Sequence, residues 1–195
     1  MAILLASTST IRRKLLTNAG IEHQTRRPDI DEEGLKLANP EFTPDQLALH
    51  LANAKCISVS NREPQHTVIG ADQVLSRGTR IFSKAENIDE ARGHLMDLSA
   101  STHTLTSAVC CARAGRVMWS FHDEAKLTMR PLSKRFVEAY LKLSGDEVIS
   151  SVGAYKLEGP GIQLFDEIKG DYFTILGLPL IPLLNFLRSA GEIAT

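Results

Sequence analysis

The chain has 195 residues, of which 43% are hydrophobic and 23% charged, and this composition is typical of one sizeable soluble globular domain. Its formal net charge is −1, so no overall field favours nucleic acid or an anionic membrane, and any phosphate site must be a local cluster. No apolar run reaches the roughly 18 residues that span a bilayer. A membrane-spanning chain and a generally basic nucleic-acid binder are therefore excluded.

The cysteines and the N-terminal residues indicate a compartment. Cys56, Cys110 and Cys111 are odd in number and are spaced like neither a zinc site nor a disulfide framework, so we expect buried free thiols. The N-terminus also lacks the apolar core and small-residue cleavage site of a signal peptide. Both features predict a cytoplasmic protein in a reducing environment.

The first informative stretch is residues 3–13. Ile3–Ala6 has the length and branching of a buried strand, and the hydroxyl-rich residues 7–10 that follow predict a turn ending in a helix N-cap before two arginines. Free backbone N–H groups, the helix dipole and an arginine would together suit an anion such as phosphate. Taken alone, the stretch is more simply an ordinary strand–turn–helix with a solvated basic turn, and the rest of the chain decides between the two.

An acidic segment and a well-marked helix come next. Residues 28–34 are expected to be mostly loop, and their carboxylates form either a solvated face or ligands for a hard divalent cation. A capping pattern at Thr43–Gln46 predicts the start of a helix. Lys55 lies one step off the expected buried stripe, near its edge. That stripe consists of Leu47, Leu51, Ala54 and Ile57 or Ser58.

Residues 67–75 form the second informative stretch, a buried strand that carries Asp72 and Gln73 at its centre. Polar side chains in a buried strand are costly unless they have partners. Two interpretations remain open, a satisfied polar pair in the core or a carboxylate held in a cleft. We favour the cleft.

The remaining pattern alternates strands and helices with antiparallel insertions, which predicts the α/β class. The expected elements are a hairpin over residues 74–81, a helix over 87–98, strands over 102–112, 116–121 and 124–129, a helix from Ser133 to near Gly145, a short strand over 164–168, a turn at 170–172 and a last helix starting at 177–179. No internal repeat or linker interrupts them, so we expect a single mixed, twisted central sheet with flanking helices.

In order and spacing, these stretches resemble the Maf family of nucleoside triphosphate pyrophosphatases over nearly the whole chain. The family's motifs correspond to residues 5–13, 29–32, 55, 69–72, 83–85, 153–159, 170–172 and 177–179. The resemblance implies a Maf/ITPase-like fold with an active-site cleft, either one domain over residues 1–195 or that domain as two lobes around the cleft. It also implies a homodimer with a nucleoside triphosphate as partner, and neither nucleic acid nor membrane.

The resemblance implies cleavage between the α- and β-phosphates, with Asp72 accepting a proton from the attacking water or only positioning that water. Glu32 and Asp72 would hold Mg²⁺ or Mn²⁺, which bind through few carboxylates together with substrate phosphates. The phosphates would be bound by Ser7, Ser9, Arg12, Lys55 and Lys84, and we expect these residues and Asp72 to converge on one cleft although they are distant in sequence.

Departures from the family pattern indicate the substrate. Ile11 stands where members acting on dTTP and UTP commonly carry arginine, Gln73 where they carry threonine, and Glu158 where they carry glutamine. Gln73 and Glu158 are similar to the branch that hydrolyses 7-methyl-GTP. The alternatives are a dTTP/UTP pyrophosphatase of the same family, a non-catalytic nucleotide-binding regulator of cell division, and a protein-interaction module without a ligand.

Overall fold

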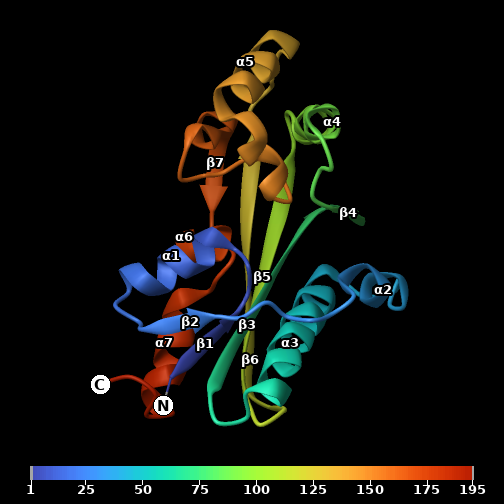
Figure 1. Cartoon of the computed structure of the whole chain (residues 1–195). Helices are drawn as coiled ribbons and strands as arrows, with labels where there is room; N and C mark the ends of the chain where they lie inside the picture. The colour runs from blue at the N-terminus through green and yellow to red at the C-terminus, as the bar shows by residue number, and fades with distance from the viewer. Residues whose placement is uncertain (1, 195) are drawn as a thin grey trace. The chain divides into compact units, whose positions relative to one another are not determined.

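The computed structural model describes residues 2–194, which form a mixed α/β structure (Figure 1). The strands are β1 (Ile3–Ala6), β2 (His23–Thr25), β3 (Thr67–Arg77), β4 (Arg80–Phe82), β5 (Thr102–Arg113), β6 (Arg116–Met129) and β7 (Phe165–Lys169). Within the described residues these form one seven-stranded sheet in the order β2-β1-β3-β5-β6-β7, with β4 paired to β3 off this path. The predicted α/β class with a single mixed sheet is confirmed.

Helices connect most of the strands. They are α1 (Thr10–Asn18), α2 (Glu32–Leu37), α3 (Pro44–Arg62), α4 (Ile88–Leu98), α5 (Lys134–Ser144), α6 (Tyr172–Ile175) and α7 (Leu180–Ser189), together with the 3₁₀ turns η1 (Gly145–Ser150) and η2 (Pro160–Leu164). Among residues 2–194 none of these helices has the length and apolar character required to cross a membrane.

The chain divides into two compact units. Within the described residues, unit 1 comprises residues 2–73, 106–123 and 171–194, and unit 2 comprises residues 74–105 and 124–170. Strands β3, β5 and β6 contribute residues to both units.

Unit 1 is built around β1, which lies parallel to both β2 and β3. Side chains alternate between the two faces of a strand, so alternate residues of β1 and β3 face different helices. Figure 1 shows α1 and α7 on one side of these strands and α3 on the other. The core cluster on the α1 and α7 side includes Ile3 and Leu5 of β1, Ile69 and Ala71 of β3, Leu16 of α1, and Leu183 and Leu187 of α7.

On the other face, α3 approaches β3 so closely that a side chain at Gly70 has no room. A Cβ atom there would lie 2.5 Å from the Ala52 carbonyl oxygen and 2.7 Å from the Cys56 Cβ. The buried face of α3 includes Lys55, so the expectation that this lysine lies at the edge of the buried stripe is wrong. The buried stripe is rotated by about one residue from the predicted one, because Ala52 and Cys56, which are the small residues, meet the strand.

The three cysteines are free and buried, as predicted. Burial raises the pKa of the Cys56 and Cys111 thiols. The Cys56 thiol also donates a hydrogen bond to the Val68 carbonyl oxygen (3.0 Å). These thiols are therefore part of the packing between α3 and the sheet.

Several local predictions are confirmed. Ser9 is the N-cap of α1, and its hydroxyl accepts from the Arg12 N–H. Thr43 and Gln46 form a capping box at the start of α3. The hairpin is the antiparallel pair β3–β4, in which Arg77 lies opposite Arg80.

Residues 28–31 of the acidic segment are loop, as predicted for most of it, and α2 then begins at Glu32, where the N-cap carboxylate of Asp31 accepts from the Gly34 N–H (2.9 Å). Two local predictions need correction. Residues 116–121 and 124–129 belong to one strand, β6, because His122 and Asp123 continue its alternation of exposed and half-buried positions. The turn at residues 170–172 leads directly into α6, whose N-cap is Asp171.

In unit 2, α4 packs on α5. The same unit contains a cluster of three rings. His103 of β5 lies near Tyr155 and Phe165, and its Nε2 is 2.7 Å from the Tyr155 hydroxyl oxygen. Burial lowers the pKa of His103 from 6.5 to about 4. The same effect raises the pKa of the Tyr155 hydroxyl, so both groups are neutral in the folded state near pH 7.

His103 makes stability depend on pH in a defined direction. Its folded pKa of about 4 is below its ordinary 6.5, so between these values the unfolded chain binds more protons than the folded one. Stability should therefore fall as the pH is lowered from 6.5 to 4, by at most about 3 kcal/mol from this residue. Urea unfolding across this range should show a flatter profile for His103→Gln, whereas His122→Gln, at an exposed position, should follow the wild type. Parallel profiles for His103→Gln and wild type would contradict the assignment.

The contact at Gly70 predicts a second stability effect. Gly70→Ala should lower the free energy of unfolding by about 1–3 kcal/mol, because the new methyl group meets backbone atoms of α3 that cannot move independently. Gly93→Ala is the matched control. Gly93 lies at an exposed position of α4 where a Cβ meets nothing within 4 Å, so alanine should raise stability by up to about 1 kcal/mol. Equal effects of the two substitutions in urea unfolding would refute the close approach of α3 and β3.

Candidate active site

The candidate site lies in unit 1, where the pairing between β1 and β3 ends. The last pair of the parallel register joins Ala6 to Gly70. Beyond it β1 becomes a turn, while β3 continues through Asp72 and Gln73 without a β1 partner. The carboxyl end of β1, the part of β3 that continues beyond it and the start of α1 therefore meet at one point, and the carboxyl ends of parallel strands are a common location for ligand sites in α/β sheets.

The turn between β1 and α1 is held by its own serines. The buried Ser7 Oγ accepts a hydrogen bond from the Ser9 N–H (3.1 Å), and the Ser9 Oγ accepts from the Arg12 N–H (3.4 Å). Both hydroxyl oxygens thus serve as acceptors, and each hydroxyl keeps its proton as a donor for a ligand. The arrangement suits an anion at the N-terminus of α1.

Arg12 points from the first turn of α1 towards the part of β3 that extends beyond its pairing with β1. Its Nη1 donates to the Ala71 carbonyl oxygen (2.9 Å) and its Nε to the Gly177 carbonyl oxygen (2.7 Å). The Ala71 carbonyl is available because this part of β3 has no partner on β1. Desolvation by burial lowers the pKa of Arg12, while the negative charges of Asp72 and Glu32 act in the opposite direction. Arg12 is therefore a half-buried cation that two backbone carbonyls hold next to two carboxylates.

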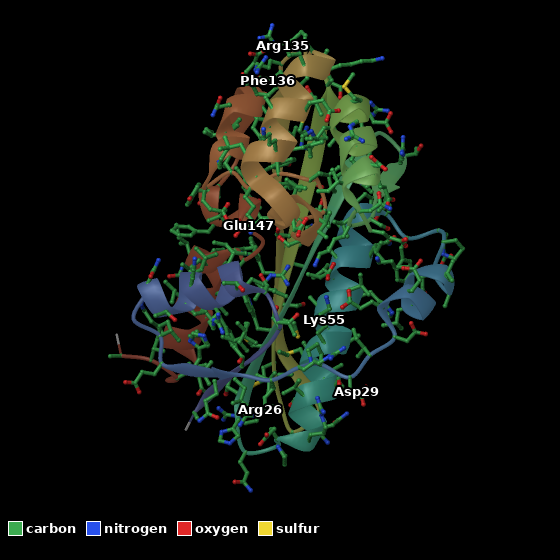
Figure 2. The ribbon with its side chains drawn as sticks, turned by 45° about the horizontal axis from the view of Figure 1, so that its top comes forward. Arg26, Asp29, Lys55, Arg135, Phe136 and Glu147 are labelled. Carbon is green, nitrogen blue, oxygen red and sulfur yellow. The ribbon has the colours of Figure 1, made fainter. Side chains whose placement is uncertain are left out.

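Lys55 joins those two carboxylates. Its Nζ is 2.6 Å from Asp72 Oδ1 and 3.1 Å from Glu32 Oε2. The Lys55 and Asp72 side chains are each 9% exposed, whereas the Glu32 side chain is 46% exposed. Figure 2 labels Lys55 on α3, which presents this lysine to β3. A buried ion pair of this kind is costly to break, because removal of one partner leaves the other charge unpaired.

The donor set fits one hard divalent cation whose remaining ligands come from the substrate. Glu32 and Asp72 supply carboxylate oxygens that both lie within 3.1 Å of the same nitrogen. Among residues 2–194 no group of three or more His, Cys, Asp or Glu side chains is placed to form a complete protein site. Mg²⁺ commonly binds in this way, through one or two carboxylates together with phosphate oxygens.

Gln73 lies next to Asp72 in sequence, but its side chain is on the opposite face of β3. Its Nε2 is 2.9 Å from the Ile175 carbonyl oxygen, 3.0 Å from Ser107 Oγ and 3.2 Å from the Thr174 carbonyl oxygen. Ser107 and Thr174 were not among the predicted site residues. Residues 102–112 carry several polar side chains besides Ser107, so no local pattern distinguishes it, and none distinguishes Thr174.

The other predicted site residues are placed as follows. Ile11, in the first turn of α1, packs half-buried against the hydrophobic cluster of unit 1. Lys84 is exposed in the loop between β4 and α4, and Glu158 is exposed just before η2, and both belong to unit 2. Burial raises the pKa of Tyr140, and the charge of Glu158 adds to this rise. The roles assigned to Ile11, Lys84 and Glu158 stay predictions.

Unit 1 thus brings together six predicted residues from four separate segments of the chain. Hydrogen bonds, ion pairs or electrostatic interactions link Ser7, Ser9, Arg12, Glu32, Lys55 and Asp72. Two hydroxyl donors, two cations and two carboxylates form a set that is chemically complementary to a triphosphate with its metal ion.

Comparison with known proteins places this chain in a family. The family described as Maf-like protein matches residues 2–190. A 7-methyl-GTP pyrophosphatase of Rhizobium etli is 47% identical over 193 residues, which are 98% of this chain and 97% of that protein. A 7-methyl-GTP pyrophosphatase of Brucella abortus is 50% identical over 188 residues, 95% of this chain and 94% of that protein.

A nucleoside triphosphate pyrophosphatase of Caulobacter vibrioides is 45% identical over 193 residues, covering 98% of this chain and 96% of that protein. A solved dITP/XTP pyrophosphatase structure from Mycobacterium abscessus is only distantly similar, with a TM-score of 0.38, 14% identity, and coverage of 97% of this chain and 98% of that one. The assignment rests on the family match and on the sequence relatives. The chain belongs to the Maf family.

Proposed function

We propose that this chain is a nucleoside triphosphate pyrophosphatase that cleaves the α–β phosphate bond and prefers 7-methyl-GTP. One observation carries the proposal: the buried Lys55–Asp72 ion pair, which is joined to Glu32 where the pairing of β1 and β3 ends. Family membership and the activity named for the relatives support the same reaction. The cytoplasm as compartment, a single catalytic domain and a homodimer belong to the proposal as well.

The residues of the site would divide the chemistry among them. The hydroxyls of Ser7 and Ser9, the N-terminus of α1 and the cations Arg12, Lys55 and Lys84 would bind the phosphates. The water oxygen would bond to the α-phosphorus while the bond to the bridging oxygen breaks and pyrophosphate leaves. Asp72 would accept the proton that the water loses.

Glu32 and Asp72 would hold one divalent cation, Mg²⁺ or Mn²⁺, which when bound would neutralise negative charge on the triphosphate. The roles proposed for the protein side chains are the same with Mg²⁺ and with Mn²⁺. They require only that Asp72 keep one oxygen for the reacting water while the other meets Lys55, which lies 2.6 Å from Oδ1.

The preference for 7-methyl-GTP follows from the charge of its base. N7-methylation makes guanine cationic and its N1–H more acidic, so a carboxylate that accepts from N1–H and the exocyclic amine gains more from the methylated base. Glu158 is that carboxylate in the proposal, and Ile11 replaces an arginine that would repel a cationic ring. Gln73 would complete the set of specificity residues.

Asp72→Asn should abolish turnover and leave the fold intact. The substitution keeps the size of the side chain but removes the charge, so we expect a loss of about 10²-fold or more in kcat. Pyrophosphate release with Mg²⁺ measures the rate, and circular dichroism checks the fold. Asp166→Asn makes the same chemical change at an exposed position of β7 and should leave the rate unchanged. Reduced stability with near-native turnover would instead support a polar pair with only a structural role.

The substrate preference predicts an order of rates. With Mg²⁺ present, kcat/KM should be higher for 7-methyl-GTP than for GTP, dTTP or UTP, and Glu158→Gln should reduce this preference because a neutral amide attracts the cationic base less. Glu167→Gln, at an exposed position in the same unit, should keep the wild-type preference. Faster hydrolysis of dTTP or UTP would overturn the proposed substrate but not the reaction. No pyrophosphate from any nucleotide would overturn the reaction and favour a non-catalytic binder.

A further inference from the structure

The side-chain amide of Gln73 is held in one orientation by its surroundings. Its Nε2 lies within 3.2 Å of three oxygen atoms, from Ser107, Thr174 and Ile175. Ser107 Oγ donates in turn to the Thr174 carbonyl oxygen (2.7 Å), so its own oxygen is available to accept from Gln73. The two protons of the amide nitrogen therefore have partners, and the network is polarised in one direction.

This network determines which atom of Gln73 faces away from it. An amide carries its oxygen and nitrogen on the same carbon, and a flipped amide would place Oε1 against two backbone carbonyl oxygens, which cannot donate. Oε1 therefore points away from α6. Gln73 thus offers a ligand only its carbonyl oxygen.

Two of the three acceptors are the last carbonyl groups of α6. The last carbonyl groups of a helix have no partner within the helix, and the amide of Gln73 meets the last two of α6. Asp171 caps the other end by accepting from the Thr174 N–H (3.0 Å), and the Thr174 hydroxyl donates to Asp123 Oδ2 (2.9 Å). Thr174 itself is fully buried. These bonds fix the position of the two carbonyl groups.

The amide also lies close to the proposed phosphate-binding residues. A Cβ atom at Gly177 would be 3.3 Å from Arg12 Nη2 and 3.7 Å from Gln73 Cδ, so one small space borders both side chains. Gly177 has a φ of +88°, a conformation that side chains rarely adopt, and its carbonyl accepts from Arg12. A nucleotide whose phosphates meet Arg12 would bring its nucleoside near this amide.

We propose that Gln73 acts as a pure hydrogen-bond acceptor for an N–H or O–H donor of the substrate nucleoside, and that Ser107 and Thr174 are positioning residues that fix it in this role. The inference rests on the proposed function. A ribose hydroxyl and the exocyclic amine of the base share the required donor chemistry. A nucleotide that presents an acceptor at this point is disfavoured, since the amide cannot turn its nitrogen outward without losing its three partners.

The first experiment identifies the donor with substrate analogues. We would measure kcat/KM for 7-methyl-GTP and for its analogues without the 2′-hydroxyl, without the 3′-hydroxyl and without the exocyclic amine. For the wild type, kcat/KM should fall about tenfold with the analogue that lacks the group bonded to Gln73. Gln73→Met should have a low kcat/KM with 7-methyl-GTP. Its kcat/KM should fall by no more than about twofold with the same analogue, because the contact is already absent.

The second experiment tests the positioning role with a matched pair. Thr174→Val keeps the shape of the side chain but removes the hydroxyl bonded to Asp123, and Thr174→Ser keeps that hydroxyl. Thr174→Val should weaken discrimination against the same analogue by at least about threefold, whereas Thr174→Ser should retain it. A purely structural role would instead lower the rates for all substrates by one common factor.

The possible results distinguish a failure of the inference from a failure of the proposed function on which it rests. If wild type releases pyrophosphate from 7-methyl-GTP but each analogue is affected equally in wild type and in Gln73→Met, Gln73 meets no donor of the substrate and the inference is overturned. Unchanged discrimination in Thr174→Val would overturn the positioning role alone. A wild type that hydrolyses no nucleotide would remove the proposed function, and the inference with it.

Discussion

The close contact between α3 and β3 is the constraint on which the candidate site of unit 1 depends. It places Lys55 of the helix beside Asp72 of the strand, with 2.6 Å between Nζ and Oδ1. Only glycine at position 70 permits this contact, because any side chain would meet the α3 backbone. The small residues Ala52 and Cys56 complete the contact from the helix side. The packing of apolar atoms and the placement of the charges are therefore one constraint, and a change that pushes α3 outward separates the charges as well.

The charges of the candidate site in unit 1 cancel one another. Arg12 and Lys55 are matched by Asp72 and Glu32, and Lys55 lies within 3.1 Å of both carboxylates. A nucleoside triphosphate brings about four further negative charges, which such a balanced site does not attract strongly. In the proposed reaction, a divalent ion held by the two carboxylates would supply the additional positive charge, because Lys55 is already counted in this balance.

Local signals in the sequence predicted much of the fold, but not the hydrogen bonds that hold Gln73. The N-caps at Ser9 and Thr43, the hairpin and the strand carrying Asp72 depend on near neighbours, so a single sequence reveals them. The rotation of the buried face of α3 was missed, because which face of a helix is buried depends on the strand it meets. The bonds of Gln73 to Ser107 and Thr174 span 34 and 101 residues, and no local pattern predicts such pairings.

The alternation of side chains along β3 divides the proposed work between two faces of one strand. Asp72 faces α3 and meets Lys55, whereas Gln73 faces α6 and meets backbone carbonyls. Both lie on the part of β3 beyond Gly70, where the pairing with β1 has ended. Charge on one face therefore suits phosphate and metal, and a neutral, fixed acceptor on the other suits the nucleoside. A shift of β3 by one residue would exchange these faces, so the register that ends at Ala6 and Gly70 is as necessary to the proposed chemistry as the carboxylate itself.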